Sequence, residues 1–234
     1  MWHGKRVGVA LPAYDEVASV AQVVREFSAT GLVDDLVVVD NNSADGTADA
    51  ARAAGARVVT ETRQGLGWAV RRGLAEAQGD LIILCEPDGT FEPRDLHRLL
   101  AYADQFEVVQ GTRTSNTLIW SGANMGRFLK WGNWAVAKLL EFLFNGPSFT
   151  DVGCTMRLLH RAIIERALPR VRVGASHVLP DLTIACLQAG ARVVEIPVNY
   201  RPRQGAWSVT SVQVAPSGEL KNLPDWVLIH SLPA

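Results

Sequence analysis

The chain has 234 residues, of which 48% are hydrophobic and 20% are charged, and its formal net charge at pH 7 is -1. This composition is typical of a folded globular domain and excludes a disordered chain. A net charge this close to zero supplies no long-range attraction for nucleic acid, so we expect no nucleic-acid partner. A phosphate-bearing ligand would have to be bound by a local cluster of side chains.

The cysteines and the N-terminus bear on the expected compartment. Cys85, Cys154 and Cys186 are odd in number, far apart and outside any CxxC pattern. This argues against a disulfide framework or a structural zinc site and favours a reducing compartment. The sequence starts without an apolar signal-peptide core and has no run of 18 apolar residues, so we predict a cytoplasmic protein with no membrane-spanning helix.

In the first half of the chain, β-branched runs alternate with amphipathic segments. The runs predict buried strands, and apolar residues three and four apart predict helices. Pro93 favours the first turn of a further helix. The predicted strands are 7–12, 36–39, 57–60, 81–84 and 108–109, and the predicted helices are 17–27, 45–54, 67–77 and 93–100.

The second half begins with a long predicted helical region, 118–145, in which tryptophans stand beside arginine and lysine. Beyond Arg203 the scattered Gly, Pro and Ser predict a mobile or partner-dependent tail. Between these segments we predict a strand at 156–159, a helix from Arg161, a helix at 182–189 and a strand at 193–198.

This alternation predicts an α/β fold with a mostly parallel sheet flanked by helices on both faces. Such sheets bind ligands at the carboxyl ends of their strands, so polar residues that directly follow strands are the candidates for function. Three segments qualify, 12–16, 40–43 and 86–88. We expect the loops that contain them to converge at one edge.

Glu86-Pro87-Asp88 places two carboxylates directly after an apolar strand. Mg²⁺ and Mn²⁺ take oxygen ligands, usually one or two carboxylates, and complete their shell with water and substrate phosphates. Taken alone, such a pair is more often a solvated turn. The interpretation as a metal site therefore depends on the neighbouring loops.

The loop that starts at Asp40 leaves a strand and enters a helix. Asp40 or Asn41 could bond a base edge or a ribose hydroxyl, while Ser43 and Asp45 are interpreted as helix-capping residues. For Asp40 a binding role and a structural role stay equally open. The loop contains no GxGxxG, so the usual dinucleotide fold is not supported.

Several motifs follow one another in a fixed order and spacing. They are Pro12-Ala-Tyr14-Asp-Glu16, Val38-Val-Asp40-Asn-Asn-Ser43-Ala-Asp45-Gly-Thr47, Gly65-Leu-Gly67, Gly79-Asp80, the acidic triplet at Glu86 and Gly111-Thr-Arg113. In these motifs the chain resembles the family 2 glycosyltransferases, and among them the polyprenyl-phosphate sugar transferases similar to dolichol-phosphate mannosyltransferase. The similarity extends to about Arg203.

The resemblance implies a single GT-A domain over 1–204, with a nucleotide-sugar-binding half at 1–115, an acceptor half at 116–204 and a C-terminal tail at 205–234. It implies an inverting, metal-dependent hexosyltransferase that uses Mg²⁺ or Mn²⁺. The donor would be a UDP- or GDP-linked sugar, and the acceptor a polyprenyl phosphate of the dolichyl type.

The resemblance also implies donor-site roles. The base and ribose would be held by Pro12, Tyr14 and Glu16 together with Asp40 or Asn41. The turn Glu86-Pro87-Asp88 would hold the metal on the diphosphate, and Arg113 would sit near phosphate, which a guanidinium can bind with two bonds. Arg201 and Arg203 resemble a basic loop that closes over the diphosphate, with a solvated basic segment as the alternative.

Three further residues are implied on the acceptor side. Asp151 and Arg157, in Thr150-Asp-Val-Gly-Cys-Thr-Met-Arg157, resemble an acceptor-pocket turn, although a turn Asp that bonds its own backbone is equally open. Arg127 begins the tryptophan-bearing segment, where a lipid phosphate would arrive.

The chain departs from the family pattern in two places. Glu86 and Pro87 stand where the family's acidic triplet usually opens with Asp, so the metal geometry is expected to differ. Asp181 stands where relatives carry Glu and is the candidate acceptor contact or general base. A hydroxyl acceptor would need such a base, and a phosphate acceptor would not.

The tryptophan-bearing segment permits two interpretations. Aromatic rings beside Lys and Arg favour peripheral contact with the cytoplasmic face of a membrane, and the alternative is a core or homo-oligomer contact. Two other functions stay open for the whole chain. A sugar nucleotidyltransferase would need a glycine-rich basic loop that Leu11-Pro12-Ala13 does not provide, and a non-catalytic donor-binding subunit is suggested by Glu86-Pro87.

Overall fold

The computed structural model describes residues 1–121, 127–144, 146–204, 213–214 and 220–221. Residues 1–204 form one compact unit and residues 205–234 a second. Within the second unit, the described residues form two short antiparallel strands, β8 (Gln213–Val214) and β9 (Leu220–Lys221). The predicted mobility of the tail concerns a segment that lies mostly outside the described residues.

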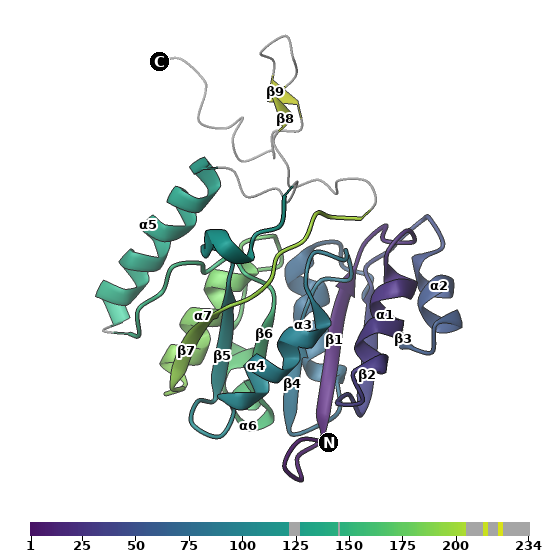
Figure 1. Ribbon diagram of the computed structural model, residues 1–234, viewed down its shortest axis with the longest axis horizontal. Helices are drawn as coiled ribbons and strands as arrows, with labels where there is room; N and C mark the ends of the chain where they lie inside the picture. The colour runs from purple at the N-terminus through teal and green to yellow at the C-terminus, as the bar shows by residue number, and fades with distance from the viewer. Residues whose placement is uncertain (122–126, 145, 205–212, 215–219, 222–234) are drawn as a thin grey trace. The chain divides into compact units, whose positions relative to one another are not determined.

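A seven-stranded sheet forms the centre of the first unit, in the order β3-β2-β1-β4-β6-β5-β7 (Figure 1). Neighbouring strands are parallel except at β6, which runs antiparallel to both β4 and β5. The strands are β1 (Val7–Ala13), β2 (Asp35–Asp40), β3 (Arg57–Thr60), β4 (Leu81–Leu84), β5 (Val108–Thr112), β6 (Arg157–His160) and β7 (Val193–Pro197).

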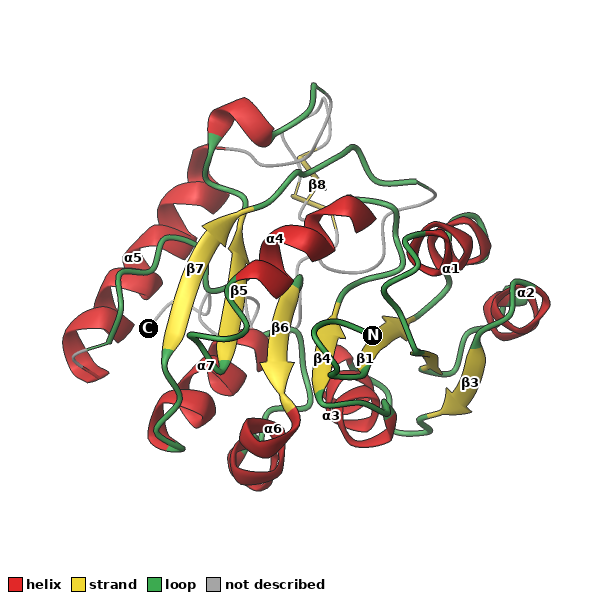
Figure 2. Ribbon diagram, turned by 60° about the horizontal axis from the view of Figure 1, so that its bottom comes forward, coloured by secondary structure: helices red, strands yellow, loops and turns green. Residues whose placement is uncertain are grey.

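Helices cover both faces of the sheet, with α1, α2 and α4 on one face and α3, α6 and α7 on the other (Figure 2). The helices are α1 (Val20–Ala29), α2 (Thr47–Ala53), α3 (Leu66–Glu76), α4 (Leu96–Ala101), α5 (Arg127–Phe144), α6 (Arg161–Ala167) and α7 (Val178–Gln188), with short 3-10 turns η1 (Pro93–Asp95), η2 (Asn116–Leu118) and η3 (Leu168–Arg170).

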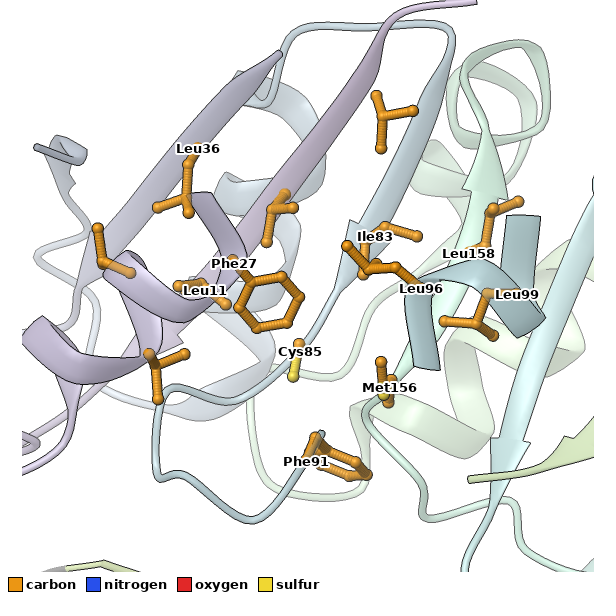
Figure 3. Packing of buried hydrophobic residues seen from close by; sticks show 14 of the residues in the cluster. Leu11, Phe27, Leu36, Ile83, Cys85, Phe91, Leu96, Leu99, Met156 and Leu158 are labelled. Atoms are coloured by element: carbon orange, nitrogen blue, oxygen red, sulfur yellow. The ribbon is translucent and has the colours of Figure 1, made fainter. Parts of the chain in front are cut away.

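Alternate residues of the central strands enter two hydrophobic clusters. In β1, Val9 and Leu11 pack on the side of α1 and α4, while Ala10 packs on the side of α3. Phe27 of α1 is fully buried in the first cluster, beside Leu11 (Figure 3). Because both faces of the sheet are covered, its strands are continuous apolar runs. Truncation of Phe27 to alanine is expected to cost about 3–5 kcal/mol.

The predicted strands and most predicted helices are present with shifted ends. The prediction was wrong for α1 over residues 17–19, which form a turn in which the carbonyl of Glu16 accepts from Ser19 N and Val17 N bonds the carboxylate of Asp45. α2 starts at Thr47 rather than at Asp45. Asp45 accepts from Thr47 N at 2.9 Å, just ahead of that helix.

The long predicted helical region begins later than expected. Leu118 ends a 3-10 turn, and Ile119 and Trp120 pair with Tyr200 instead of entering a helix. The regular helix, α5, starts at Arg127. The prediction was therefore wrong over 118–121, where backbone groups bond a distant segment.

The outer surface of α5 is apolar in its described part. Val136, Leu139, Phe142 and Leu143 are exposed, Phe142 to 82%, and their spacing places them on one side of the helix. Ala137 lies on the buried side of α5 and packs in the second hydrophobic cluster. In the described part of the chain, no helix is long and apolar enough to cross a membrane.

Candidate active site

The candidate site lies at the carboxyl ends of β1, β2, β4 and β5, as predicted for a parallel sheet. The antiparallel strand β6 starts at the same edge, because Arg157 at its beginning pairs with Leu84 and Gln110 near the ends of β4 and β5. The turn that precedes β6 therefore brings residues 150–155 to this edge.

The loops after β1 and β2 are bonded to each other. The amide of Asp15 donates to Ser43 Oγ at 3.0 Å, and the carboxylate of Asp15 accepts from Ala44 N at 2.9 Å. The amide of Glu16 donates to Thr47 Oγ1 at 2.8 Å. Tyr14, between these anchors, is exposed at the edge, whereas Pro12 is buried within β1. The two loops thus form one wall of the site.

Asp40 and Asn41 have different environments. One carboxylate oxygen of Asp40 accepts from Ser43 N at 3.2 Å, and its side chain is almost fully buried at the end of β2. The amide of Asn41 donates to the carbonyls of Glu61 and Arg63 and accepts from Gly65 N at 2.8 Å. Asn41 therefore holds the loop between β3 and α3, and Asp40 is the better candidate for a ligand.

The acidic turn after β4 is largely withdrawn from solvent. Asp88 is 3% exposed and accepts from Thr90 N and Thr90 Oγ1 at 3.0 and 2.7 Å. Burial, and next the charge of Asp88, raises the pKa of Glu86 to about 7. Pro87 lies buried between them. Two carboxylates so close together are stabilised in their charged forms by a nearby positive charge.

Arg203 already supplies part of that charge. Its guanidinium bonds Asp88 at 3.0 Å and also bonds Glu16. Burial raises the pKa of Glu16 to about 7, with Arg203 opposing and Asp88 reinforcing the shift. The first loop and the acidic turn are therefore joined through one arginine.

The acidic turn offers two carboxylates, those of Glu86 and Asp88, that would hold a divalent cation. Mg²⁺ and Mn²⁺ are commonly bound by one or two carboxylates together with substrate phosphates. No group of three or more His, Cys, Asp or Glu side chains suited to a metal occurs among the described residues. Glu86 and Asp88 form an acidic pair, and the guanidinium of Arg203 forms an ion pair with Asp88.

Arg203 belongs to a segment, 198–204, that crosses the site after β7. Arg201 N donates to the carbonyl of Thr90 at 2.7 Å, and Gln204 N donates to the carbonyl of Asp88 at 3.0 Å. The guanidinium of Arg201 pairs with Glu92 and lies 5.2 Å from the ring of Trp120. This segment brings the Arg203 guanidinium to the acidic turn, whereas the Arg201 guanidinium pairs with Glu92 and Glu26 beside it.

Arg113, directly after β5, forms a bidentate ion pair with Asp151. The two bonds measure 2.7 and 2.9 Å, and Arg113 N bonds the same carboxylate at 3.1 Å. Burial alone would lower the pKa of Arg113, but the charge and hydrogen bonds of Asp151 raise it above its usual range. The charge of Arg113 also acts on Glu86, which places both residues in one electrostatic cluster.

Two predicted acceptor residues occupy scaffold positions. Arg157 is 1% exposed, and its guanidinium donates to the carbonyl of Cys154 and to Thr183 Oγ1. The backbone of Arg157 lies at the site edge, but its buried side chain packs against α7, where the guanidinium bonds Thr183. The carboxylate of Asp181 accepts from the amides of Arg172 and Val173 at 2.8 and 3.0 Å, which fixes the loop before α7.

Arg127 is the first residue of α5, and its side chain lies outside the described residues, as do those of Lys130 and Trp131. One residue of the edge escaped the sequence analysis. Glu195 in β7 accepts from Thr150 N, Thr150 Oγ1 and Asp151 N. Its signal in the sequence was a single carboxylate inside an otherwise apolar strand.

Two relatives of similar sequence are described as glycosyltransferases. The chain is 27% identical to Glycosyltransferase AglJ of Haloferax volcanii over 200 residues, which is 84% of this chain and 63% of that protein. It is 31% identical over 211 residues to the uncharacterized glycosyltransferase Rv0539 of Mycobacterium tuberculosis, with 89% of this chain and 91% of that protein covered.

Solved structures share the fold. A mycobacterial protein superposes with a TM-score of 0.68 at 24% identity, over 88% of this chain and 68% of its own. Glucosyl-3-phosphoglycerate synthase from M. tuberculosis, in complex with Mn²⁺ and UDP-glucose, gives a TM-score of 0.65 at 22% identity, over 88% of this chain and 72% of its own. The predicted GT-A fold is confirmed.

A family model provides the assignment. The model described as glycosyl transferase family 2 matches residues 8–168, which is more than half of the chain. The match includes the two bonded loops, the acidic turn and the Arg113–Asp151 pair. The chain therefore belongs to glycosyl transferase family 2.

Proposed function

We propose that the protein transfers a sugar, with inversion, from a UDP- or GDP-linked donor to a phosphate-bearing acceptor, with Mg²⁺ or Mn²⁺ as cofactor. The observation that carries the proposal is the acidic turn, where half-buried Glu86 and buried Asp88 lie beside the charges of Arg203 and Arg113. A diphosphate with its cation suits such a mixture of buried carboxylates and guanidinium groups.

Each wall of the site has a part in the proposed reaction. Tyr14 and Asp40 would contact the base and ribose, with Pro12 and the two bonded loops holding them in place. Glu86 and Asp88 would hold the cation, which when bound neutralises charge on the leaving diphosphate. The guanidinium groups of Arg201 and Arg203 would orient the diphosphate oxygens and help to exclude water.

The environment of Asp181 favours an acceptor that is already ionised. One carboxylate oxygen of Asp181 accepts from two backbone amides, so this side chain is committed to the loop before α7. A hydroxyl acceptor would need a free base, and a phosphate oxygen would not. We therefore favour a phosphate as the attacking group.

A polyprenyl phosphate is the proposed source of that phosphate. The exposed apolar side of α5, with Leu139, Phe142 and Leu143, is suited to the boundary of a bilayer, and exposed Trp134 is a residue type found at such interfaces. Arg127 at the start of α5 would then meet the lipid phosphate. Among the structural neighbours, glucosyl-3-phosphoglycerate synthase is solved with phosphoglyceric acid, which makes a small phosphorylated acceptor the second candidate.

The test begins with donor binding. Calorimetry with UDP, GDP and their glucose and mannose conjugates, with and without Mn²⁺, is expected to show tight binding of one nucleotide only when the metal is present. Metal-independent binding, or no binding, would contradict the proposed site.

Turnover then separates the candidate functions. Transfer from the bound donor to polyprenyl phosphate or to 3-phosphoglycerate would identify the acceptor class. Release of pyrophosphate from a nucleoside triphosphate and a sugar phosphate would indicate the nucleotidyltransferase alternative. Binding without any turnover would indicate the non-catalytic subunit.

A further inference from the structure

Glu195 stands in β7 opposite Gln110 of β5 and is bonded to the turn before β6. Its carboxylate accepts from Thr150 N at 2.7 Å, Thr150 Oγ1 at 2.6 Å and Asp151 N at 2.9 Å. Burial raises the pKa of this carboxyl, while the bonds from Thr150 oppose the shift. Three donors converge on one carboxylate, which locks the start of the turn onto the sheet.

The locked turn carries Asp151, which in turn holds Arg113. Asp151 is fully buried, and its carboxylate bonds Arg113 Nε and Nη2 and also accepts from Gly153 N. A guanidinium is a planar fork, so when Nε and Nη2 face Asp151 the Nη1 edge points away from it. The position of Asp151 therefore sets the direction of the Arg113 donors.

Three threonine hydroxyls surround this connection. Thr112, Thr114 and Thr150 lie with their Oγ1 atoms 2.9 Å apart in each pair. Thr150 gives its single hydroxyl proton to Glu195, which can only accept when ionised, so in its contacts with Thr112 and Thr114 the hydroxyl of Thr150 can accept but not donate. Glu195 thus also fixes the hydroxyls on either side of Arg113.

We propose that Glu195 is a positioning residue for the phosphate-binding arginine, acting through the turn 150–151 and Asp151 on Arg113. This inference rests on the proposed function and takes Arg113, beside the acidic turn, as a further guanidinium that bonds the donor diphosphate. Asp151 is fully buried, while Glu195, Thr150 and Arg113 are half-buried, so the hydrogen bonds of the network lie in a setting of low dielectric constant that strengthens them. Loss of the Glu195 charge would release the turn, and Arg113 would lose its fixed direction.

The experiment compares nucleotides that differ only in phosphate. Affinities of UDP and UMP, or of GDP and GMP if guanine is the base, are measured by calorimetry with Mn²⁺. Glu195→Gln keeps the shape of the side chain and is expected to weaken diphosphate binding about tenfold or more, while the monophosphate binds as in the wild type. A variant that simply failed to fold would bind all of these ligands more weakly, and to the same extent.

A matched control is available on the same two strands. Glu107 precedes β5 and bonds Arg192 N and the Arg192 guanidinium just before β7, at the end opposite to the site. Glu107→Gln removes a comparable charged clamp and is expected to leave the ratio of diphosphate to monophosphate affinity unchanged.

Two further variants cover the case in which Glu195→Gln folds poorly. Thr150→Val removes the hydroxyl that donates to Glu195 and is expected to lower the diphosphate affinity selectively. Thr150→Ser keeps a hydroxyl at this position and is expected to bind the diphosphate as the wild type does. In an Arg113→Lys background, Thr150→Val should have little further effect, because both changes act on one contact.

The outcomes distinguish the two proposals. If the wild type binds a diphosphate with Mn²⁺ and neither Glu195→Gln nor Thr150→Val changes its affinity selectively, the positioning role is wrong and the proposed function stands. If the wild type binds neither UDP nor GDP, the proposed function fails and the role of Glu195 fails with it.

Discussion

At the scale of single residues, Asp88 bonds both Thr90 and Arg203 and would also bind the cation. Asp88→Asn keeps the size of the side chain but removes its charge. We expect turnover to fall by about two orders of magnitude or more and the metal-dependent part of donor binding to disappear. Calorimetry with and without Mn²⁺ measures the second effect, and the exposed Asp104→Asn serves as the control. Unchanged metal dependence in Asp88→Asn would remove the metal assignment.

Glu16 predicts a pH dependence of stability. Its carboxyl has a pKa of about 7 in the folded protein, raised from 4.5 mainly by burial. Between those values the unfolded chain has lost a proton that the folded chain keeps. The contribution of Glu16 to the free energy of unfolding therefore falls as the pH rises from about 4.5 to about 7 and is constant above. Urea unfolding between pH 5 and 8 should show that the free energy of unfolding of Glu16→Gln falls less steeply with rising pH than that of the wild type. Identical slopes would contradict the shift.

The sequence placed the acidic turn and Asp40 at strand ends, as the structure has them, because the strand-end rule needs only local information. It did not identify the roles of Asn41, Arg157 and Asp181, whose partners depend on tertiary packing. Asn41, for example, bonds Gly65 N across the loop between β3 and α3. A side chain of the right type near a strand end can serve the scaffold or the ligand, and only the positions of its partners decide which.

At the scale of elements, the contact between α3 and the loop before α7 depends on Gly67. A Cβ atom at this position would lie 2.2 Å from the carbonyl oxygen of Val173 and 2.6 Å from the backbone of Gly174. Gly67→Ala must therefore separate two backbones, and we expect a loss of about 1–3 kcal/mol or more. Gly132→Ala is the matched control, because nothing lies within 4 Å of its Cβ position in α5. Thermal unfolding should show a lower melting temperature than the wild type for Gly67→Ala and no lower melting temperature for Gly132→Ala.

The apolar side of α5 gives a second prediction at this scale. Phe142 is 82% exposed, so Phe142→Gln should change the free energy of unfolding by less than about 0.5 kcal/mol. If this surface contacts a bilayer, the same variant should sediment less with anionic lipid vesicles than the wild type. Tyr102→Gln, which changes an exposed aromatic residue directly after α4, is the control. Equal recovery of all three proteins in the supernatant would contradict membrane contact.

At the scale of the whole molecule, the sheet was predictable in class but not in order. Continuous apolar strands alternating with helices indicated a covered, mostly parallel sheet, which the structure confirms. The antiparallel insertion of β6 between β4 and β5 was not predicted, because an apolar run has no direction in its composition. Its consequence for the site is large, since β6 brings Asp151 to the edge where Arg113 ends β5.

The same strand order decides when the molecule can be completed during synthesis. β3, β2, β1 and β4 all come from residues 7–84 and can pair as soon as they emerge. In the described part of the chain, β5 pairs only with β6 and β7, which are made about 50 and 85 residues later. A nascent chain that stops before residue 150 therefore carries the acidic turn without Asp151 or Arg203, and presents β5 as an unpaired edge open to aggregation.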